Sequence, residues 1–211
     1  YTDGRLQAPA TADGFVMVYG SKEACVDNIA AFRSEGKQWL DERKERMNNI
    51  IMKSNPMKSN LDSLDLAIAW LLLTTDELVT KQQGRGIYAG LPWFNEYWGR
   101  DMFISMPGAC LVTGQFDIAK EILKDFAKLQ DTDPESETYG RIPNRANLEG
   151  ILYNTTDGTP RFVIQAYQLA QYSGDTEFLH ELYPAISMSI NASIKNYTDK
   201  KGYLTHADAD T

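Results

Sequence analysis

Cysteine and histidine are both scarce in this chain of 211 residues. Two cysteines cannot form a disulfide framework, and in a chain of this length they are typical of buried free thiols in a reducing compartment. We therefore expect Cys25 and Cys110 to be unpaired, a disulfide between them being the alternative, and the protein to be cytoplasmic. His180 and His206 lie far apart, and no group of His, Cys and carboxylate residues has ligand spacing, which argues against a metal site.

Positive charge and long apolar runs are also lacking. The chain carries 21 basic and 29 acidic residues, and no basic stripe is present, so nucleic acid is not an expected partner. Neutral polar ligands fit this charge better than phosphate-rich ones. The longest apolar run, at 66–73, is far shorter than the ~20 residues that span a bilayer, so we expect no membrane partner. We also expect no cofactor.

The pattern of the chain predicts three parts. Residues 1–20 end in a β-rich run bounded by Gly14 and Gly20, which we interpret as the end of an upstream β-rich lobe. Residues 21–56 form a long linker helix that Ser21 caps and that ends near Pro56, because its apolar residues share one face and its other face is charged. Residues 57–211 form a helical domain.

Inside this domain we expect six helices. The first is apolar nearly all round in its middle, which predicts burial on both sides. Thr159 with Pro160 is typical of a helix start, and Asp175 and Pro184 are expected to open two separate helices. The expected ranges are 59–81, 100–112, 115–130, 159–172, 175–182 and 184–196.

Two of these segments repeat. Residues 101–123 and 161–183 align at an offset of 60 residues, with Gly114 falling on Gly174, which indicates an array of helical hairpins joined by tight glycine turns. The long connections, at 82–99, at 131–158 and from 198 onward, then lie at one end of the array. Loops longer than about 12–15 residues are usually functional, although mere surface insertions are the alternative.

The first long connection has an unusual composition. Four aromatic rings fall within six residues and precede Arg100 and Asp101. Sugars present apolar C–H faces and hydroxyl groups, so a sugar site needs flat aromatic platforms and planar hydrogen-bonding groups. The alternative is that the rings plug the end of the array and that Arg100 and Asp101 form a local ion pair. The rings belong to Trp93, Phe94, Tyr97 and Trp98.

Three motifs in this region resemble the amylo-α-1,6-glucosidase domains of glycogen-debranching enzymes, which are related to glucoamylases. They read AGLPWF at 89–94 followed by WGRD at 98–101, GRIPN at 140–144, and YNTTDG at 153–158. The resemblance implies an all-α fold, here a partial (α/α)6 toroid preceded by a short β segment and a long linker helix, with 57–211 as its N-terminal half. It also implies inverting hydrolysis of α-1,6-linked glucose, with an α-glucan oligosaccharide or a glycogen branch as the partner.

The resemblance also assigns roles to residues. Arg100 and Asp101 are expected to hydrogen-bond the 4- and 6-hydroxyls of the terminal glucose, with Trp98 lining that subsite. Trp93 is expected to contribute from its chemistry alone, as one of the aromatic platforms described above. Asn144 and Asp157 are expected as neighbouring contacts, although Asp157 with Gly158 is also consistent with a simple turn. Arg161 departs from the family, which usually has an aromatic residue near that point.

The general acid and base are expected beyond Thr211, because the family's acid follows a Thr-Trp-Met-Asp motif that would begin there. Asp208 and Asp210 stand just before that point, at positions the family does not use for catalysis. We therefore expect this chain alone to bind glucose without turnover, and its open edges to be covered by the remainder of the toroid or by a second copy. A glucoamylase- or trehalase-like α-glucosidase and a non-catalytic helical-repeat binding protein remain the alternatives.

Overall fold

A computed structural model describes residues 18, 20–54, 58–82, 84–147 and 150–205. Most of the β-rich run at 14–20 lies outside the described residues, as do His206, Asp208 and Asp210. The chain divides into two compact units, Tyr1–Asn48 and Asn49–Thr211. The domain boundaries that the sequence suggested, after residues 20 and 56, stay a prediction.

The long helix α1 covers Lys22–Ser54, close to the predicted range. Ser21 caps it, because its Oγ accepts a hydrogen bond of 3.2 Å from the amide of Ala24. Most of its side chains are exposed, and these include large apolar ones such as Phe32, Trp39 and Leu40.

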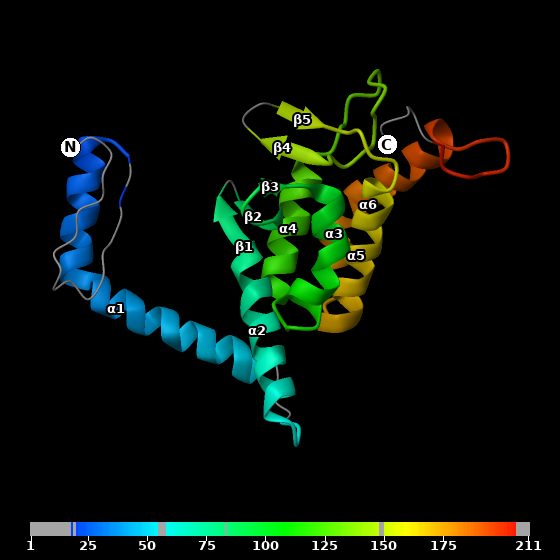
Figure 1. The fold of residues 1–211 in the computed structure, drawn as a ribbon. Coiled ribbons are helices and arrows are strands. Elements are labelled where there is room, and N and C mark those ends of the chain that lie inside the picture. The colour runs from blue at the N-terminus through cyan, green and yellow to red at the C-terminus, as the bar shows by residue number, and fades with distance from the viewer. Residues whose placement is uncertain (1–17, 19, 55–57, 83, 148–149, 206–211) are drawn as a thin grey trace. The chain divides into compact units, whose positions relative to one another are not determined.

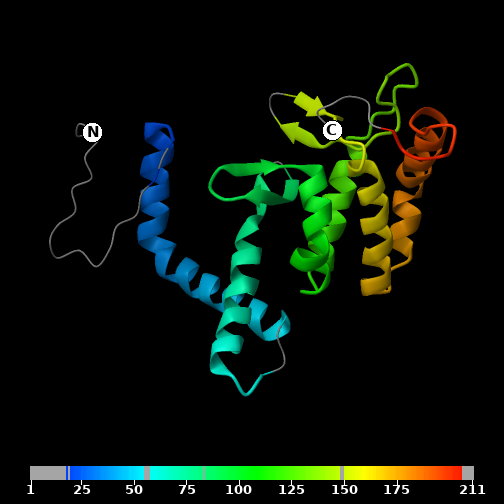
Figure 2. The same cartoon turned by 45° about the vertical axis from the view of Figure 1, so that its right-hand side comes forward.

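Four helices build the centre of the second unit as two successive hairpins (Figure 1). The first consists of α3 (Gly99–Met106), which continues through a π-helical turn η1 (Pro107–Leu111), and α4 (Phe116–Lys128). The second consists of α5 (Gly158–Ser173) and α6 (Glu177–Asn196). Helix α3 packs beside α5 and α4 beside α6 (Figure 2), as the repeat predicted.

The two hairpins turn through equivalent glycines. Gly114 and Gly174 have φ angles of 71° and 72°, a left-handed conformation that glycine adopts without a steric cost. The predicted alignment of Gly114 with Gly174 is therefore confirmed by the backbone itself.

The hydrophobic core lies where the four helices meet. The ring of Phe103 on α3 packs edge-on against Phe126 of α4, with centroids 5.4 Å apart, and against Phe162 of α5 at 5.7 Å. Phe103 and Phe162 are fully buried, and the apolar face predicted for α4 is buried with them. This core fixes the first turns of α3 and α5 relative to one another.

The first expected helix and loop of this unit need correction. Helix α2 covers Asp62–Leu78 rather than 59–81, because Val79 takes an extended conformation and begins a strand. The segment expected as the loop 82–99 largely forms an antiparallel sheet of β1 (Val79–Gln82), β2 (Gly84–Gly90) and β3 (Phe94–Tyr97), in the order β1-β2-β3. Glycine at position 86 makes this possible, because the Tyr97 ring covers the place where a Cβ would stand.

Two further expectations about the helices are wrong. The middle of α2 is not buried on both sides, because Leu66, Trp70 and Leu71 are exposed among the described residues. Residues 175–196 do not form two helices either. Helix α6 runs through Pro184 without a break, and its buried residues lie both before the proline and after it, at Leu182 and Ala192, so packing holds the helix together across the missing amide.

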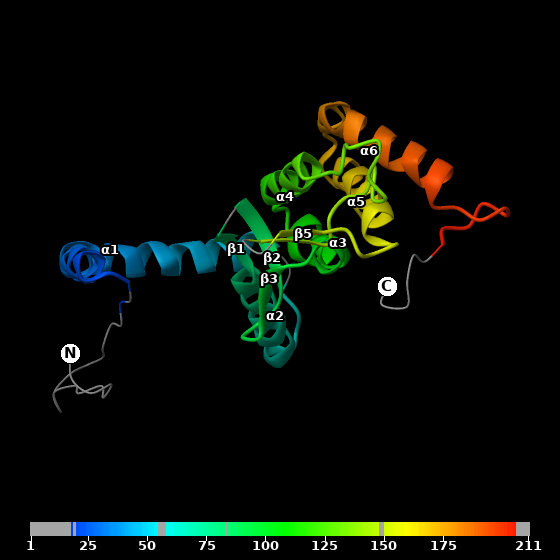
Figure 3. The same cartoon turned by 90° about the horizontal axis from the view of Figure 1, so that it is seen from above.

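The long connections lie together at one end of the helices, as predicted. The second connection contains a hairpin of β4 (Arg145–Asn147) and β5 (Gly150–Leu152), and the third forms a turn closed by a bridge between Thr198 and Leu204. In the view from above, the β4–β5 hairpin lies over the helices near α3, whereas the turn of the third connection lies to the side, beyond the end of α6 (Figure 3). The described part of the chain is thus mostly helical, and its five short strands were not included in the all-α expectation.

The two thiols are unpaired, as expected. Burial raises the pKa of the Cys110 thiol to about 12, with a smaller contribution from the charge of Asp76. Within the described part of the chain, no helix combines the length and the apolar character needed to cross a membrane.

Candidate functional site

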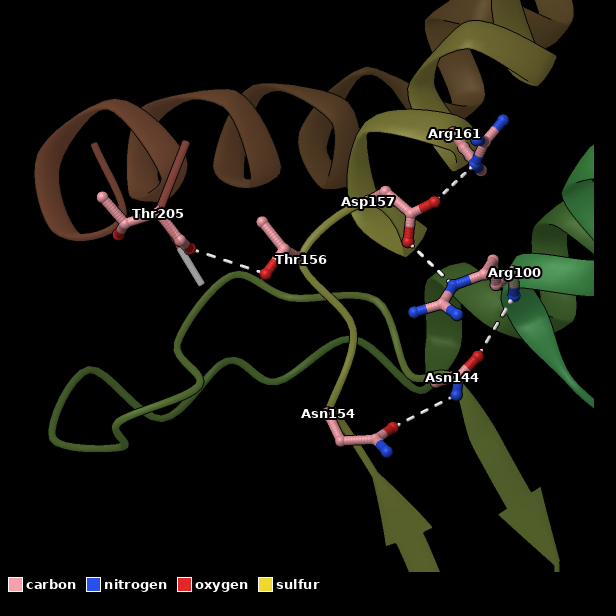
Figure 4. A network of polar contacts seen from close by, with 7 residues as sticks. All are labelled: Arg100, Asn144, Asn154, Thr156, Asp157, Arg161 and Thr205. Atoms are coloured by element: carbon pink, nitrogen blue, oxygen red, sulfur yellow. Dashed lines mark hydrogen bonds and ion pairs between the residues drawn. The ribbon is translucent and has the colours of Figure 1, made fainter. Parts of the chain in front are cut away.

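Asp157 is the centre of a polar cluster at the end of the helices where the long connections lie. It is the N-cap residue of α5, yet its side chain makes no capping hydrogen bond, and the N3 position of this helix is Pro160, which has no amide hydrogen to offer. Its two carboxylate oxygens are used elsewhere. Oδ1 accepts a hydrogen bond of 2.9 Å from Nε of Arg100, and Oδ2 accepts one of 2.7 Å from Nε of Arg161 (Figure 4).

The electrostatics of the cluster favour an ionised carboxylate. Desolvation raises the pKa of Asp157, but the hydrogen bond from Arg161 and the charge and hydrogen bond of Arg100 outweigh it, so the pKa lies below its ordinary value. All three side chains are about two-fifths exposed, so the cluster opens to solvent. At neutral pH Asp157 is therefore a charged acceptor and is not suited to donate a proton.

A cavity of about 570 Å³ opens beside this cluster, within the size range of small-molecule sites. Arg100, Asp157 and Arg161 supply its charged groups. Its other walls are less polar, so one cavity offers both hydrogen-bonding groups and apolar surface. The remaining residues that line it are Thr156, Pro160, Ile164 and Leu204.

Asn144 supports the cluster from the second connection. Its carbonyl oxygen accepts a hydrogen bond of 2.6 Å from the amide of Gly99, and its side-chain Oδ1 accepts one of 3.3 Å from the amide of Arg100. These are two of the amides that the start of α3 would otherwise leave without a partner, since Trp98 makes no side-chain cap. Asn144 itself is buried, and its Nδ2 donates to Oδ1 of Asn154 at 3.1 Å.

The contact between Asn144 and α3 depends on glycine at position 99. A Cβ there would lie 2.5 Å from the carbonyl oxygen of Pro143 and 3.0 Å from the Phe126 ring, so a larger residue would push the loop away. The GRIPN loop is also tied to the third motif, because Arg141 donates to the carbonyl of Tyr153 and the Ile142 amide donates to Oγ1 of Thr159. The structure thus brings all three motifs together.

The aromatic residues of the first motif are spread over a surface. Trp98 forms a backbone bridge with Arg145, whose guanidinium lies 5.5 Å from the centroid of the indole ring. Tyr97 packs against Tyr88, at a centroid distance of 5.7 Å. Trp93 lies in the turn between β2 and β3 with 83% of its surface exposed, and it is not among the described residues that line the cavity.

Asp101 lies next to Arg100 in sequence but differs from it in surroundings. Its side chain is exposed and forms no hydrogen bond or ion pair within the described part of the chain. The alternative interpretation of a local ion pair between Arg100 and Asp101 is therefore wrong, because Arg100 pairs with Asp157, 57 residues away. Successive residues of a helix point about 100° apart, which accounts for the difference.

Sequence reasoning missed part of this arrangement. Arg161 was set aside as a departure from the family, although its position four residues after Asp157 is the spacing at which helical side chains meet. Leu204 was not named, and Thr156 lies in the third motif without having been singled out, because the third connection reaches the cavity only through its fold, with Thr156 Oγ1 donating to the Thr205 carbonyl at 3.5 Å. Among the described residues, no group of three or more His, Cys, Asp or Glu side chains is arranged to hold a metal ion.

Comparison with known proteins places the chain in a family. Residues 48–211 match the family model described as amylo-alpha-1,6-glucosidase, so the chain belongs to that family. It is 32% identical over 126 residues to the glycogen debranching enzyme of Saccharomyces cerevisiae (strain ATCC 204508 / S288c), a match that covers 53% of this chain and 8% of the yeast protein. The chain thus spans a small fraction of the length of this curated relative. No solved structure matches it.

Proposed function

We propose that this chain supplies the glucose-binding part of an amylo-α-1,6-glucosidase, which releases α-1,6-linked glucose from a glycogen branch by inverting hydrolysis. The observation that carries the proposal is the cavity of about 570 Å³ beside Arg100, Asp157 and Arg161. Membership of the family and the similarity to a glycogen debranching enzyme support it.

The cavity has the groups that a glucosyl unit requires. Guanidinium groups present planar sets of N–H donors to hydroxyl oxygens, and the Asp157 carboxylate can accept from hydroxyl hydrogens. The apolar side chains in the same wall suit the C–H face of a pyranose. In this proposal Arg100 and Asp157 bind glucose directly, Asn144 holds Arg100 in place, and Asp101, Trp98 and Trp93 contribute from the surrounding rim.

Hydrolysis with inversion uses two carboxyl groups roughly 6.5–9.5 Å apart, one as general acid and one as general base. Asp157 is paired with two arginines and has a lowered pKa, so it does not suit the role of the acid. We assign the acid and the base to residues outside the described cluster, and we expect binding without turnover from the groups that it contains.

The proposal includes the architecture of an (α/α)6 toroid. Helices α3 and α5 are its inner helices and α4 and α6 its outer ones, each hairpin being one repeat of the array. Large apolar side chains stay exposed on α2, α5 and α6, for example Trp70, Tyr167 and Ile194. Contiguous exposed apolar surface is typical of an interface. In the proposed toroid, further helices of the same domain cover it, and a second copy of the chain is the alternative.

A binding titration tests the proposal. We expect ¹H–¹⁵N NMR to show saturable binding of glucose by the purified chain, and Arg100→Met to weaken it by at least about tenfold, the effect of losing charged hydrogen bonds. Arg85→Met is the matched control. Arg85 has a comparable exposure, 33% against 38% for Arg100, and also pairs with one carboxylate, Glu121 at 3.1 Å.

Two results would contradict the proposed function. One is the absence of glucose binding by the wild-type chain, and the other is an Arg100→Met variant that binds as tightly as the wild type. The linkage is tested separately, by measuring glucose release from branched limit dextrin and from linear maltooligosaccharides with the natural protein that contains this sequence. Faster release from the linear substrate would favour the glucoamylase-like alternative.

A further inference from the structure

A second cavity, separate from the one beside the charged cluster, runs along α6. Its volume is about 560 Å³, and none of the described residues lines both cavities. Tyr139 contributes to it from the second connection. Much of the remaining wall comes from one side of α6, with residues that recur every four positions: Tyr183, Ser187, Asn191 and Lys195.

The loop that carries Tyr139 is fixed against α6, beside which it lies in Figure 3. Nε2 of the buried Gln130 is within hydrogen-bonding distance, at 2.9–3.0 Å, of the Gly140 carbonyl and of two acceptors on α6. Gly140 has a φ of 82° and approaches α6 so closely that a Cβ would overlap with Ala192. Tyr197 Oη donates to the carbonyl of Tyr139 at 2.9 Å. The wall of the cavity therefore stands in place before a ligand binds.

The side chains that line this cavity suit a neutral ligand with many hydroxyl groups. Tyr139 and Tyr183, which is 66% exposed, offer aromatic rings to the C–H faces of sugars. Asn191 and Lys195 are exposed and offer amide and ammonium donors to hydroxyl oxygens. Among the described lining residues Lys195 is the single charged group, whereas acidic ligands are bound by clusters of cations. The net charge of −8 also disfavours an acidic partner.

The length of the cavity favours a chain of sugars over a single one. More than three helical turns, or roughly 18 Å along the axis, separate Tyr183 from Lys195. A single pyranose ring is much shorter than this. The part near Lys195 lies at the same end of the helices as the candidate site, because α6 ends at Asn196 and α5 begins at that end.

We propose that the cavity lined by Tyr139, Tyr183 and Asn191 is a non-catalytic site for a linear α-glucan chain, distinct from the glucose site. The class of ligand rests on the proposed function, because a branched polymer whose end enters the glucose site holds further chains close to the protein. A second contact with the same polymer raises the effective concentration of branch ends at the glucose site.

The proposed toroid leaves this cavity open. Ile190 and Ile194 of α6 line a different, apolar groove of about 360 Å³ together with residues of α5. The further helices of the toroid are expected to cover that apolar groove. The cavity of Tyr139 and Tyr183 uses other positions of α6 and stays available to a ligand.

Electrophoresis through native gels with and without glycogen tests the site, because binding to the polymer retards the protein. Arg100→Met disables the glucose site, so the retardation that this variant keeps reports on the second site. Adding Tyr183→Ala is expected to weaken the remaining binding by about three- to tenfold, the effect of losing one aromatic contact. Tyr172→Ala in the same background is the control and is expected to change nothing. Tyr172 is 52% exposed on α5 and lies near the Gly174 turn, at the other end of the helices.

A second variant tests the site without relying on an aromatic ring. Asn191→Ala is expected to weaken the remaining binding by about two- to tenfold, the effect of losing one or two hydrogen bonds. The fold should tolerate this change, because Asn191 is exposed and donates only to Ser187 of its own helix, at 3.3 Å. In ¹H–¹⁵N NMR, maltoheptaose is expected to shift the amides around Tyr183 and Asn191. Shifts there with a glutamate-rich peptide and none with maltoheptaose would assign the cavity to an acidic peptide and overturn the proposal.

The outcomes separate this inference from the function on which its ligand class rests. The second site is wrong if glycogen does not retard Arg100→Met, or if it retards Arg100→Met with and without Tyr183→Ala equally. The glucose titration decides the proposed function independently, and Tyr183→Ala alone is expected to leave the affinity for glucose within about twofold of the wild type. If the wild-type chain does not bind glucose but its retardation depends on Tyr183, the glucan site stands and the proposed function fails.

Discussion

The two helical hairpins share a scaffold and differ at the end where the candidate site lies. At positions related by the 60-residue offset, Ala109 and Leu169 are buried, Ile104 and Ile164 are exposed at 51% and 49%, and Gly114 and Gly174 make the same turn. In the first turns of α3 and α5 the same offset pairs Asp101 with Arg161, an acid with a base.

This comparison separates positions at which the fold requires a particular kind of residue from positions at which it does not. Gly114 and Gly174 match because the turn needs a positive φ angle, and Ala109 and Leu169 match in burial because both belong to the core. At the end that carries the cavity, Asp101 and Arg161 differ in charge, and nothing in the packing requires this difference. The repeat therefore draws attention to these two residues, although pairs at the other end, such as Leu111 and Gln171, differ as well.

The largest expected effect separates the buried and exposed faces of α3. Phe103→Ala should lower the free energy of unfolding by about 3–5 kcal/mol, because the fully buried ring contacts Phe126 and Phe162 and its loss leaves a cavity. Ile104→Ala, at the next position, should cost less than about 1 kcal/mol. Chemical denaturation measures both. Equal costs would show that the exposed face of α3 is covered in solution, in disagreement with its exposure in the structure.

The glycine turns should give a smaller and matched effect. Gly114→Ala and Gly174→Ala are each expected to destabilise by about 1–2 kcal/mol, because no atom obstructs the new Cβ and only the left-handed backbone opposes it. Gly108→Ala serves as the control, since Gly108 lies within the π-helical turn without a positive φ and is expected to gain stability. Costs that differ by more than about 1 kcal/mol would show that the two hairpins are not equivalent.

The smallest effect concerns the charged cluster. Asp157→Asn should lower stability at neutral pH by less than about 1 kcal/mol, because the ion pairs are half-exposed. The native pKa of Asp157 is lowered, so its contribution is present above the unfolded value of about 3.9 and is lost as the pH falls through the native pKa. Denaturation curves between pH 7 and pH 2 should therefore converge for the two proteins.

A control distinguishes this charge effect from a general loss of acid groups. Asp117 is 97% exposed, and Asp117→Asn should follow the wild-type curve at every pH. A difference between wild type and Asp157→Asn that persists at pH 2 would mean that the substitution acts through packing or through α5 itself.

Much of the helical part of the fold could be predicted from the sequence. The apolar spacing of α4, the Ser21 cap of α1 and the two glycine turns each rest on a local rule, and each was confirmed. The sheet of β1, β2 and β3 could not be predicted in this way, because its aromatic residues favour a strand as readily as a binding loop. The break between two helices that was expected at Pro184 is wrong for a related reason. Core packing on both sides of the proline outweighs its local tendency to interrupt a helix.

The sequence predicted which residues belong to the candidate site better than it predicted the contacts between them. Arg100, Asn144 and Asp157 were named from the motifs, and the structure joins them in one network. The partners of Arg100 lie 44 and 57 residues away along the chain. No local pattern predicts which distant carboxylate a given arginine contacts. Arg161 was undervalued because a departure from a family was weighed more heavily than the four-residue spacing to Asp157.

The way in which α3 begins has a consequence for any attempt to move or redesign this motif. The backbone and side chain of Asn144 together complete the first turn of a helix that starts 45 positions earlier, and Gly99 leaves the space for this contact. A graft of the WGRD segment alone into another protein would therefore lack the contacts that hold it in its native conformation. The smallest transferable unit runs from the tryptophan to the asparagine, and it includes the whole first hairpin.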